Sequence, residues 1–220
     1  PEAAFGHYSE AFQRDGTLRV NLRALRRLQL ERDDVSAAIK TLDGEVRVCR
    51  NQAQRATLLY ERGLLQQIQG DERQAESSFK RAMEMDATFL PALAMLGHLS
   101  EAKGDTANAS KLHVRMAQIC EDDHRKALIM AEVGVLAELD KKQADALDRY
   151  RIAIGYEPQL VGARFALERL YTVRGDWGAL TDLLLQKADR STDTPVDAAY
   201  RFMASAIAVH RLGEDLRAAV

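Results

Sequence analysis

A short phrase that recurs along the chain constrains its fold more than any other feature. The phrase Gly-Asp-x-x-x-Ala begins at Gly70 and again at Gly104, 34 residues later. Related phrases begin at Gly175 and Gly213. A fixed period of this size is typical of proteins built from stacked structural repeats, in which no single unit can bury its apolar face alone. The sequence therefore predicts a repeat array.

Each repeat reads as two helices joined by a tight turn. Apolar residues recur at helical spacing over 56–69, and Gly70 suits the left-handed residue that follows a helix end. A second helix is expected over 72–85, with a turn at 86–88. Pro91 then falls in the first turn of the next helix, where its missing N–H is not needed. One unit is therefore helix, turn, helix and short loop.

The register of the units follows from their small residues. We number each unit from its first helical residue, which is Ala56 in the first complete unit. Positions 8 and 20 then hold small residues that let two helix backbones approach, while a larger residue at position 24 fills the space beside them. These small residues are Gly63, Gly97 and Gly134 at position 8, and Ala75, Ala109 and Ala146 at position 20.

This register resembles the tetratricopeptide-repeat (TPR) family over about 56–220. The third unit carries the most specific match, with Ala146, Tyr150, Ala153 and Pro158 at the family's spacing. Two kinds of position depart from the family pattern. Position 4, where the family has Trp, holds Leu59, Leu93, Met130 and Arg164, and position 27 of the fourth unit is Lys187 instead of a small residue. The resemblance implies an all-α fold, a right-handed α-α superhelix (solenoid) of helix-turn-helix repeats.

We expect two segments that continue into each other as one solenoid. Residues 1–55 form N-terminal helices over about 2–13, 18–30 and 35–51, including a degenerate unit with Arg19 at position 1. Residues 56–220 form the TPR array, whose units lie near 56–89, 90–123, 127–160 and 161–194, with a partial unit at 199–220. Insertions are expected at 124–126 and before the last unit. The first and last residues suggest a piece of a longer chain.

Composition excludes several functional classes. The net charge is −2 and charges of both signs are mixed, so no global basic field favours nucleic acid. No apolar run is long enough to span a bilayer and no signal peptide is visible, so we expect a cytoplasmic protein without a membrane partner. Phosphate-binding loops, nucleophile elbows and metal-binding Cys or His pairs are also missing. We therefore expect no enzyme, no cofactor and no metal.

A few residues have the chemistry of a site but are better explained as structure. Cys49 and Cys120 are expected to be free thiols, and residues 120–124 a helix end whose Asp122 or Asp123 caps the next helix. His113 and Trp177 are expected to pack in the core, although Trp177 could also serve as an exposed anchor. An arginine stripe near the N-terminus is interpreted as a solvated face, with RNA contact as the alternative. The stripe consists of Arg19, Arg23, Arg26 and Arg27.

The TPR resemblance implies that the first helix of each unit lines a concave groove. The residues predicted to contact a partner there are Tyr60, Glu61, Leu64, Met95, His98, Glu132, Val135, Phe165 and Arg169. Their mixture of apolar anchors and a few charges suits a peptide or a helix laid in a groove. Family members that clamp acidic chaperone tails carry Lys and Asn at these positions, and this chain does not.

We therefore predict a non-catalytic scaffold or adaptor that binds peptide or helical segments of other proteins. One alternative is an RNA-processing component, which depends on the arginine stripe. Another is a regulatory TPR region of an enzyme whose catalytic domain lies outside this sequence. Self-association through exposed ends of the solenoid is also expected to be possible.

Overall fold

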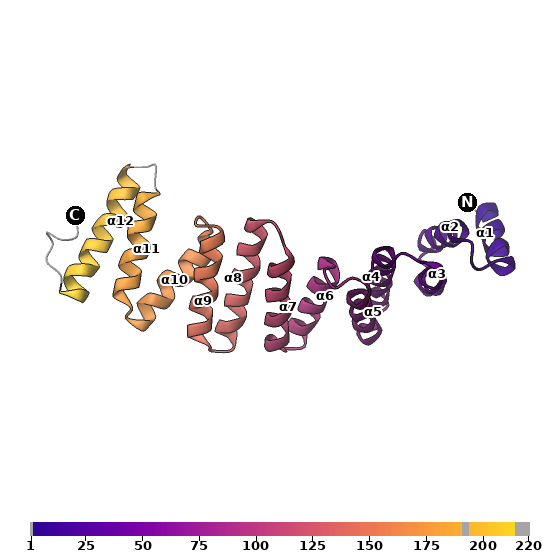
Figure 1. Cartoon of the computed structure of the whole chain (residues 1–220), viewed down its shortest axis with the longest axis horizontal. Coiled ribbons are helices and arrows are strands. Elements are labelled where there is room, and N and C mark those ends of the chain that lie inside the picture. The colour runs from indigo at the N-terminus through magenta and orange to yellow at the C-terminus, as the bar shows by residue number, and fades with distance from the viewer. Residues whose placement is uncertain (1, 191–193, 214–220) are drawn as a thin grey trace. The chain divides into compact units, whose positions relative to one another are not determined.

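The computed structural model describes residues 2–190 and 194–213, and these residues form helices joined by short turns, with no strand among them (Figure 1). The helices are α1 (Glu2–Arg14), α2 (Arg19–Leu30), α3 (Val35–Val48), α4 (Gln52–Ile68), α5 (Glu72–Met85), α6 (Leu90–Ala102), α7 (Thr106–Ile119), α8 (Asp123–Leu139), α9 (Gln143–Tyr156), α10 (Val161–Arg174), α11 (Trp177–Asp189), α12 (Thr194–Ile207) and the π-helical η1 (Ala208–Leu212). The predicted all-α repeat fold is confirmed. Position 20 of the last unit, Ala218, lies outside the described residues.

The helices fall into two compact units, which comprise residues 1–119 and residues 120–220. In the first unit α2 packs on α3, α4 on α5 and α6 on α7, and consecutive pairs stack on each other. In the second unit α8 packs on α9, and α10 follows on α9. Within each compact unit the chain is thus built from helix pairs, as the 34-residue period predicts.

The turn inside each helix pair has the same backbone conformation. Position 15 is left-handed throughout, with positive φ at Gly70, Gly104, Gly175 and Gly213 and also at Asp33 and Lys141. Asp33 supports the placement of Arg19 at position 1 of the degenerate unit. The next residue then caps the second helix, since Asp34, Asp71, Asp105 and Asp176 each accept a hydrogen bond from the N–H three residues on. The Gly-Asp phrase therefore ends one helix and starts the next.

Position 8 has no room for a side chain, because the ring at position 24 lies against it. A Cβ on Gly63 would lie 2.4 Å from Phe79, one on Gly134 2.7 Å from Tyr150, and one on Gly97 3.0 Å from His113. The sequence predicts close approach at position 8, and this is confirmed. The structure adds that the close neighbour is the ring at position 24.

Three helices in the described part of the chain, α4, α8 and α12, begin several residues before position 1 of their unit. The insertion at 124–126 forms part of the first turn of α8, which begins at Asp123, and Asp122 caps it as predicted by accepting a hydrogen bond from the N–H of Arg125. In the same way α3 ends at Val48 and α4 begins at Gln52, where Asn51 caps the helix by accepting from the N–H of Gln54. The extra residues therefore lengthen the first helix of a unit at its N-terminus.

The degenerate N-terminal unit, which starts at Arg19, and the fourth unit, which starts at Val161, replace the small residues at positions 8 and 27 with an ion pair. Arg26 pairs with Glu45 in the N-terminal unit, and Glu168 pairs with Lys187 in the fourth. The α2–α3 pair still packs extensively, and its position 20 is the fully buried Ala38. The α10–α11 pair packs much less, and α11 packs mainly on α12. Position 20 of this fourth unit is the larger Leu180.

Replacing Gly134 with Ala should destabilise the fold by roughly 1–3 kcal/mol, because the new methyl group overlaps the Tyr150 ring. Urea denaturation gives the free energy of unfolding. Gly155→Ala is the matched control, since Gly155 is helical and a Cβ there meets nothing within 4 Å. This control should be stabilised by up to about 1 kcal/mol. Equal effects of the two substitutions would contradict the packing argument.

Replacing Lys141 with Gly should stabilise the fold by about 1 kcal/mol, since Lys141 has a φ of 60° and Gly tolerates this conformation without a steric penalty. The midpoint of urea denaturation measures the change. Lys141→Ala separates the backbone effect from loss of the lysine side chain, because it removes the charge but keeps a Cβ. If Lys141→Ala stabilised the fold as much as Lys141→Gly does, the backbone explanation would be refuted.

Candidate functional site

A groove of about 870 Å³ runs along α8 and α10 in the second compact unit. Four of the nine residues predicted to contact a partner line it, namely Glu132, Val135, Phe165 and Arg169. Glu132 and Val135 come from α8, and Phe165 and Arg169 come from α10. First-helix positions of two consecutive units thus meet in one hollow, which we call the α8–α10 groove.

Large apolar side chains stand exposed in the α8–α10 groove. Phe165 and Leu139 are each 68% exposed and Val135 is 51% exposed, and all three line the same hollow. Single exposed apolar residues are common on protein surfaces, whereas several on one concave surface are typical of a binding site. Leu139 stands at position 13 of its unit, another of the first-helix positions that the TPR resemblance places in the groove.

A polar network lies beside these apolar residues. The Tyr150 hydroxyl donates a hydrogen bond of 2.8 Å to Glu138, whose other carboxylate oxygen pairs with Arg169. Burial raises the pKa of Tyr150, and the hydrogen bond to Glu138 raises it further, so the hydroxyl remains a donor at neutral pH. Arg169 is held in place by Glu138 while half of its side chain stays exposed. It can therefore pair with an acidic group of a ligand.

The other five predicted contacts lie in the first compact unit and are more enclosed. The Tyr60 ring packs 5.6 Å from both Phe79 and Phe89, measured between centroids. Leu64 and Met95 are partly buried against the same core. Glu61 pairs with Arg26, and His98 remains exposed with its Nδ1 3.6 Å from Glu101. These side chains contribute to packing as well as to the surface.

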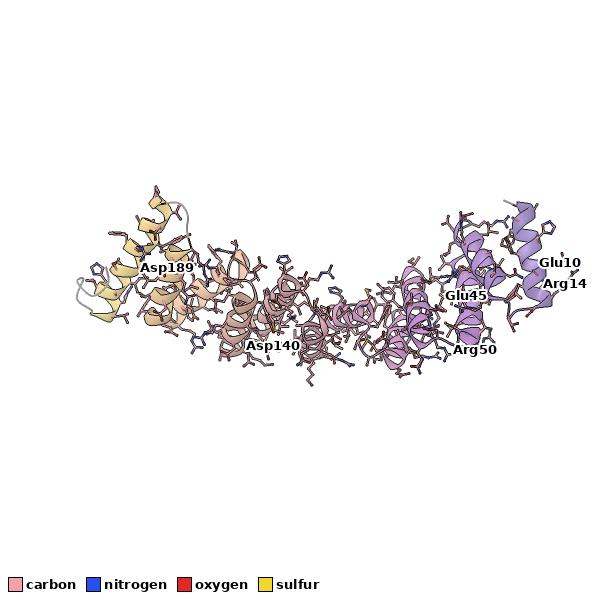
Figure 2. All side chains as sticks on the ribbon, turned by 45° about the horizontal axis from the view of Figure 1, so that its top comes forward. Glu10, Arg14, Glu45, Arg50, Asp140 and Asp189 are labelled. Atoms are coloured by element: carbon pink, nitrogen blue, oxygen red, sulfur yellow. The ribbon has the colours of Figure 1, made fainter. Side chains whose placement is uncertain are left out.

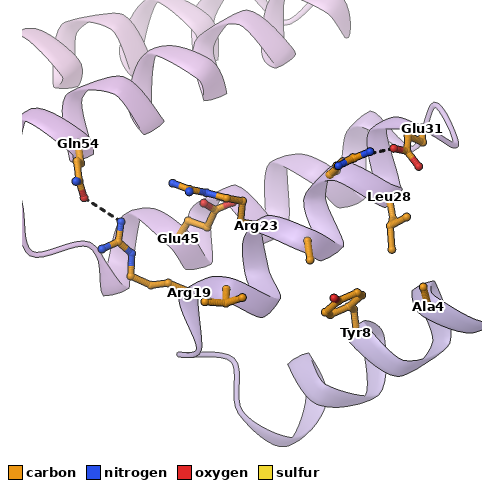
Figure 3. Close-up of a pocket in the computed structure, with 11 residues that line it drawn as sticks. Ala4, Tyr8, Arg19, Arg23, Leu28, Glu31, Glu45 and Gln54 are labelled. Carbon is orange, nitrogen blue, oxygen red and sulfur yellow. Dashed lines mark hydrogen bonds and ion pairs between the residues drawn. The ribbon is translucent and has the colours of Figure 1, made fainter. Parts of the chain in front are cut away.

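A second hollow of about 770 Å³ lies between α1 and α2 (Figure 3). Tyr8 of α1 and Leu28 of α2 face it, and Arg19 of α2 donates a hydrogen bond of 3.0 Å to Gln54 across its far end. The carboxyl of Glu45 lies close to Arg23 in the same view, and Glu45 is only 4% exposed. The solvated pair of Glu10 and Arg14 on α1 contrasts with this buried carboxyl (Figure 2).

The arginine stripe is not one solvated face, which corrects the sequence prediction. Arg26 is half-buried among α2, α3 and α4, with 15% of its side chain exposed, and it pairs there with Glu45 at 2.7 Å and also with Glu61. Arg27 does lie in solvent and pairs with Glu31 at 2.9 Å, as predicted. The sequence missed the role of Arg26 because its two partners lie on other helices.

Comparison with solved structures identifies the fold. A TPR protein from Parabacteroides merdae superposes with a TM-score of 0.57 at 16% identity, over 91% of this chain and 75% of that one. YrrB, described as a TPR protein with an unusual peptide-binding site, superposes with a TM-score of 0.54 at 14% identity, over 89% of this chain and 97% of that one. The C-terminal part of a TPR protein from Cytophaga hutchinsonii superposes with a TM-score of 0.59 at 12% identity, over 95% of this chain and 81% of that one.

This chain has the tetratricopeptide-repeat fold. No family model and no curated protein matches its sequence. Likeness at this level of identity identifies the fold alone, and the binding properties of this chain have to be argued from its own residues.

The remaining candidates on the TPR chain have structural roles. Cys120 and Cys49 are free and buried, and His124 pairs with Glu157. Across residues 2–190 and 194–213, no three His, Cys, Asp or Glu side chains gather in a way that could hold a metal ion. Over the same residues, no helix combines the length and the apolar character needed to cross a membrane. Trp177 is half-buried, with the guanidinium of Arg211 4.8 Å from its ring.

The buried carboxyl of Glu45 predicts a pH effect on stability. Burial raises its pKa above the ordinary 4.5, with Glu61 adding to the rise, while Arg26 and Arg23 oppose it. The protonated form is therefore favoured by folding, so this contribution is present below about pH 4.5 and is lost as the pH rises through the folded-state pKa.

Glu45→Gln should remove this loss, because the amide stays neutral. The free energy of unfolding of the variant, relative to the unmodified chain, should increase between about pH 4 and about pH 7 in urea denaturation. Glu84→Gln on the exposed side of α5 is the control and should leave the pH dependence unchanged. A relative stability that falls over this range would show that the ion pair with Arg26 outweighs burial.

Proposed function

We propose that the chain is a non-catalytic scaffold that holds a peptide or helical segment of another protein in the α8–α10 groove. The observation that carries this proposal is the exposure of Phe165, Leu139 and Val135 within one hollow beside Arg169. Apolar anchors give such a complex most of its affinity, and a few charged groups set orientation. The groove is formed by rigid helices, so little ordering is needed on this side of the complex.

The architecture of the fold supports the same function. In a TPR repeat the glycines, alanines and second-helix rings maintain packing, and the first helices leave side chains free to vary. YrrB, which superposes over 89% of this chain, is described as having a peptide-binding site. We infer that this chain binds a peptide as well, through its own residues.

The ligand of the groove should be amphipathic. Phe165 and Leu139 favour apolar side chains spaced along one face of an extended or helical segment. Arg169 keeps half of its side chain in solvent and favours a carboxylate on the segment. A segment that combines apolar residues with an acidic residue therefore suits this surface best.

An RNA-processing role has less support, since Arg26 is half-buried in ion pairs and Arg27 is paired with Glu31. Control of an enzyme domain outside this sequence would use the same groove. Self-association through the ends of the array and a cytoplasmic location stay predictions.

The proposal is tested with peptides selected for binding from a random display library. Substituting Phe165 and Val135 together by Ala should weaken binding of such peptides at least about tenfold in fluorescence anisotropy titrations. Both side chains are exposed, so the fold should be retained, which circular dichroism and the melting temperature verify.

The control is Phe202→Ala, because Phe202 is 75% exposed on α12 and does not line the groove. This control should bind the selected peptides with an affinity within about twofold of that of the unmodified chain. If the double variant binds all selected peptides as well as the unmodified chain, or if the control loses as much affinity, the groove is not the binding surface.

A further inference from the structure

A second, smaller pocket of about 280 Å³ lies at α10, α11 and α12 of the second compact unit. Three cationic side chains line it, namely Arg164, Lys187 and Arg190, together with Tyr200 and Phe165. It is separate from the α8–α10 groove, although Phe165 lines both. The pocket lies beside the α10–α11 pair, whose two helices pack less on each other than those of the other helix pairs. We call it the cationic pocket.

Arg164 is buried with part of its hydrogen-bonding capacity unused. The residue is 7% exposed, and its Nη1 donates a hydrogen bond of 3.1 Å to the side-chain oxygen of Gln159. Its Nη2 is buried and has no hydrogen-bond partner within the described part of the chain. A buried charge without full pairing is costly, so this guanidinium calls for an explanation.

The electrostatic surroundings leave Arg164 undercompensated. Burial lowers its pKa, and the neighbouring Arg190 lowers it further, whereas Glu168 has the opposite effect. Glu168 is itself paired with Lys187, whose ammonium lies 4.5 Å from the centre of the Tyr200 ring. The nearby Asp189 pairs with Arg201 at 2.7 Å. Among residues 2–190 and 194–213, three cations therefore line the pocket and Glu168 is the one carboxylate that raises the pKa of Arg164.

Repeat packing does not require these cations. Arg164 stands at position 4 of its unit, where the three preceding units have Leu59, Leu93 and Met130. Each of these three is buried. Lys187 stands at position 27, where Ala82 and Ala153 are fully buried in other units. Two of the departures from the repeat pattern in this unit, at positions 4 and 27, thus line one pocket.

We propose that the cationic pocket binds a phosphate dianion, either as free phosphate or as a phosphate monoester on a ligand. The fork of donors on a guanidinium matches the oxygens of phosphate, and the free Nη2 of Arg164 supplies the buried donor. A phosphate monoester carries about −1.5 to −2 charges at neutral pH, which balances the excess of two cations over Glu168. A ligand with a single carboxylate would balance only one of these two excess positive charges. This proposal stands independently of the groove function.

Inorganic phosphate is the first probe, and the melting temperature of the full chain is the readout. Phosphate should raise the melting temperature by a few degrees more than sodium chloride of the same ionic strength, because a ligand that binds only the folded state stabilises it. Arg164→Met should abolish this rise. The same substitution should increase the melting temperature without phosphate, because it removes a buried charge and introduces the residue of the third unit at this position.

Arg190→Gln is the second variant, since Arg190 is exposed at the end of α11 and its loss should not impair folding. It should weaken phosphate binding roughly 10- to 100-fold, the effect of losing hydrogen bonds to a charged group. Arg174→Gln is the matched control, because Arg174 is an exposed arginine at the end of α10 that does not line the pocket. This variant should retain the full rise in melting temperature with phosphate.

A phosphoserine peptide and its unphosphorylated form distinguish the two sources of phosphate. Tighter binding of the phosphopeptide than of inorganic phosphate supports a ligand-borne monoester, and equal binding supports free phosphate. The proposal is overturned if phosphate stabilises the chain no more than chloride does. It is also overturned if Arg164→Met keeps the phosphate response.

Discussion

The contact between the glycine at position 8 and the ring at position 24 governs how each regular helix pair packs. Phe79, His113 and Tyr150 each occupy the space that a side chain at position 8 would need. When the ring at position 24 carries a polar group, the carboxylate of a glutamate at position 12 of the first helix forms a hydrogen bond with that group. His113 meets Glu101 at 2.6 Å, and Tyr150 meets Glu138 at 2.8 Å. The latter acid also holds Arg169, so the packing contact positions a charged group of the groove.

Two units lack this contact and show what replaces it. Both place an ion pair at positions 8 and 27, but only the first keeps a small residue, Ala38, at position 20. Its helices still pack extensively, whereas α10 and α11 with Leu180 at position 20 do not. The looser fourth unit leaves room for the cationic pocket beside α12. A departure from the repeat pattern thus coincides with a change in surface chemistry.

Much of the fold could be predicted from the sequence because repeat packing depends on local spacing. The left-handed turns at Gly70, Gly104, Gly175 and Gly213 follow from residue type, whereas the one at Lys141 does not. First-helix positions of consecutive units do meet in the α8–α10 groove. Arg26 was misplaced because its environment depends on Glu45 and Glu61 from other helices. The cap of α8 at Asp122 was predicted, whereas the start of α4 was missed because its capping residue, Asn51, was assigned to the end of the preceding helix.

The half-buried pairing of Arg26 has a consequence for how the first compact unit unfolds. One guanidinium on α2 pairs with a carboxylate on α3 and with another on α4, and α3 and α4 belong to successive repeats. If α2 detached alone, Glu45 and Glu61 would lose their shared counter-ion together. Nearest-neighbour repeats in principle unfold one at a time from an end. Because the pair with Glu61 crosses from one repeat to the next, detachment of α2 would also break a contact with the following repeat.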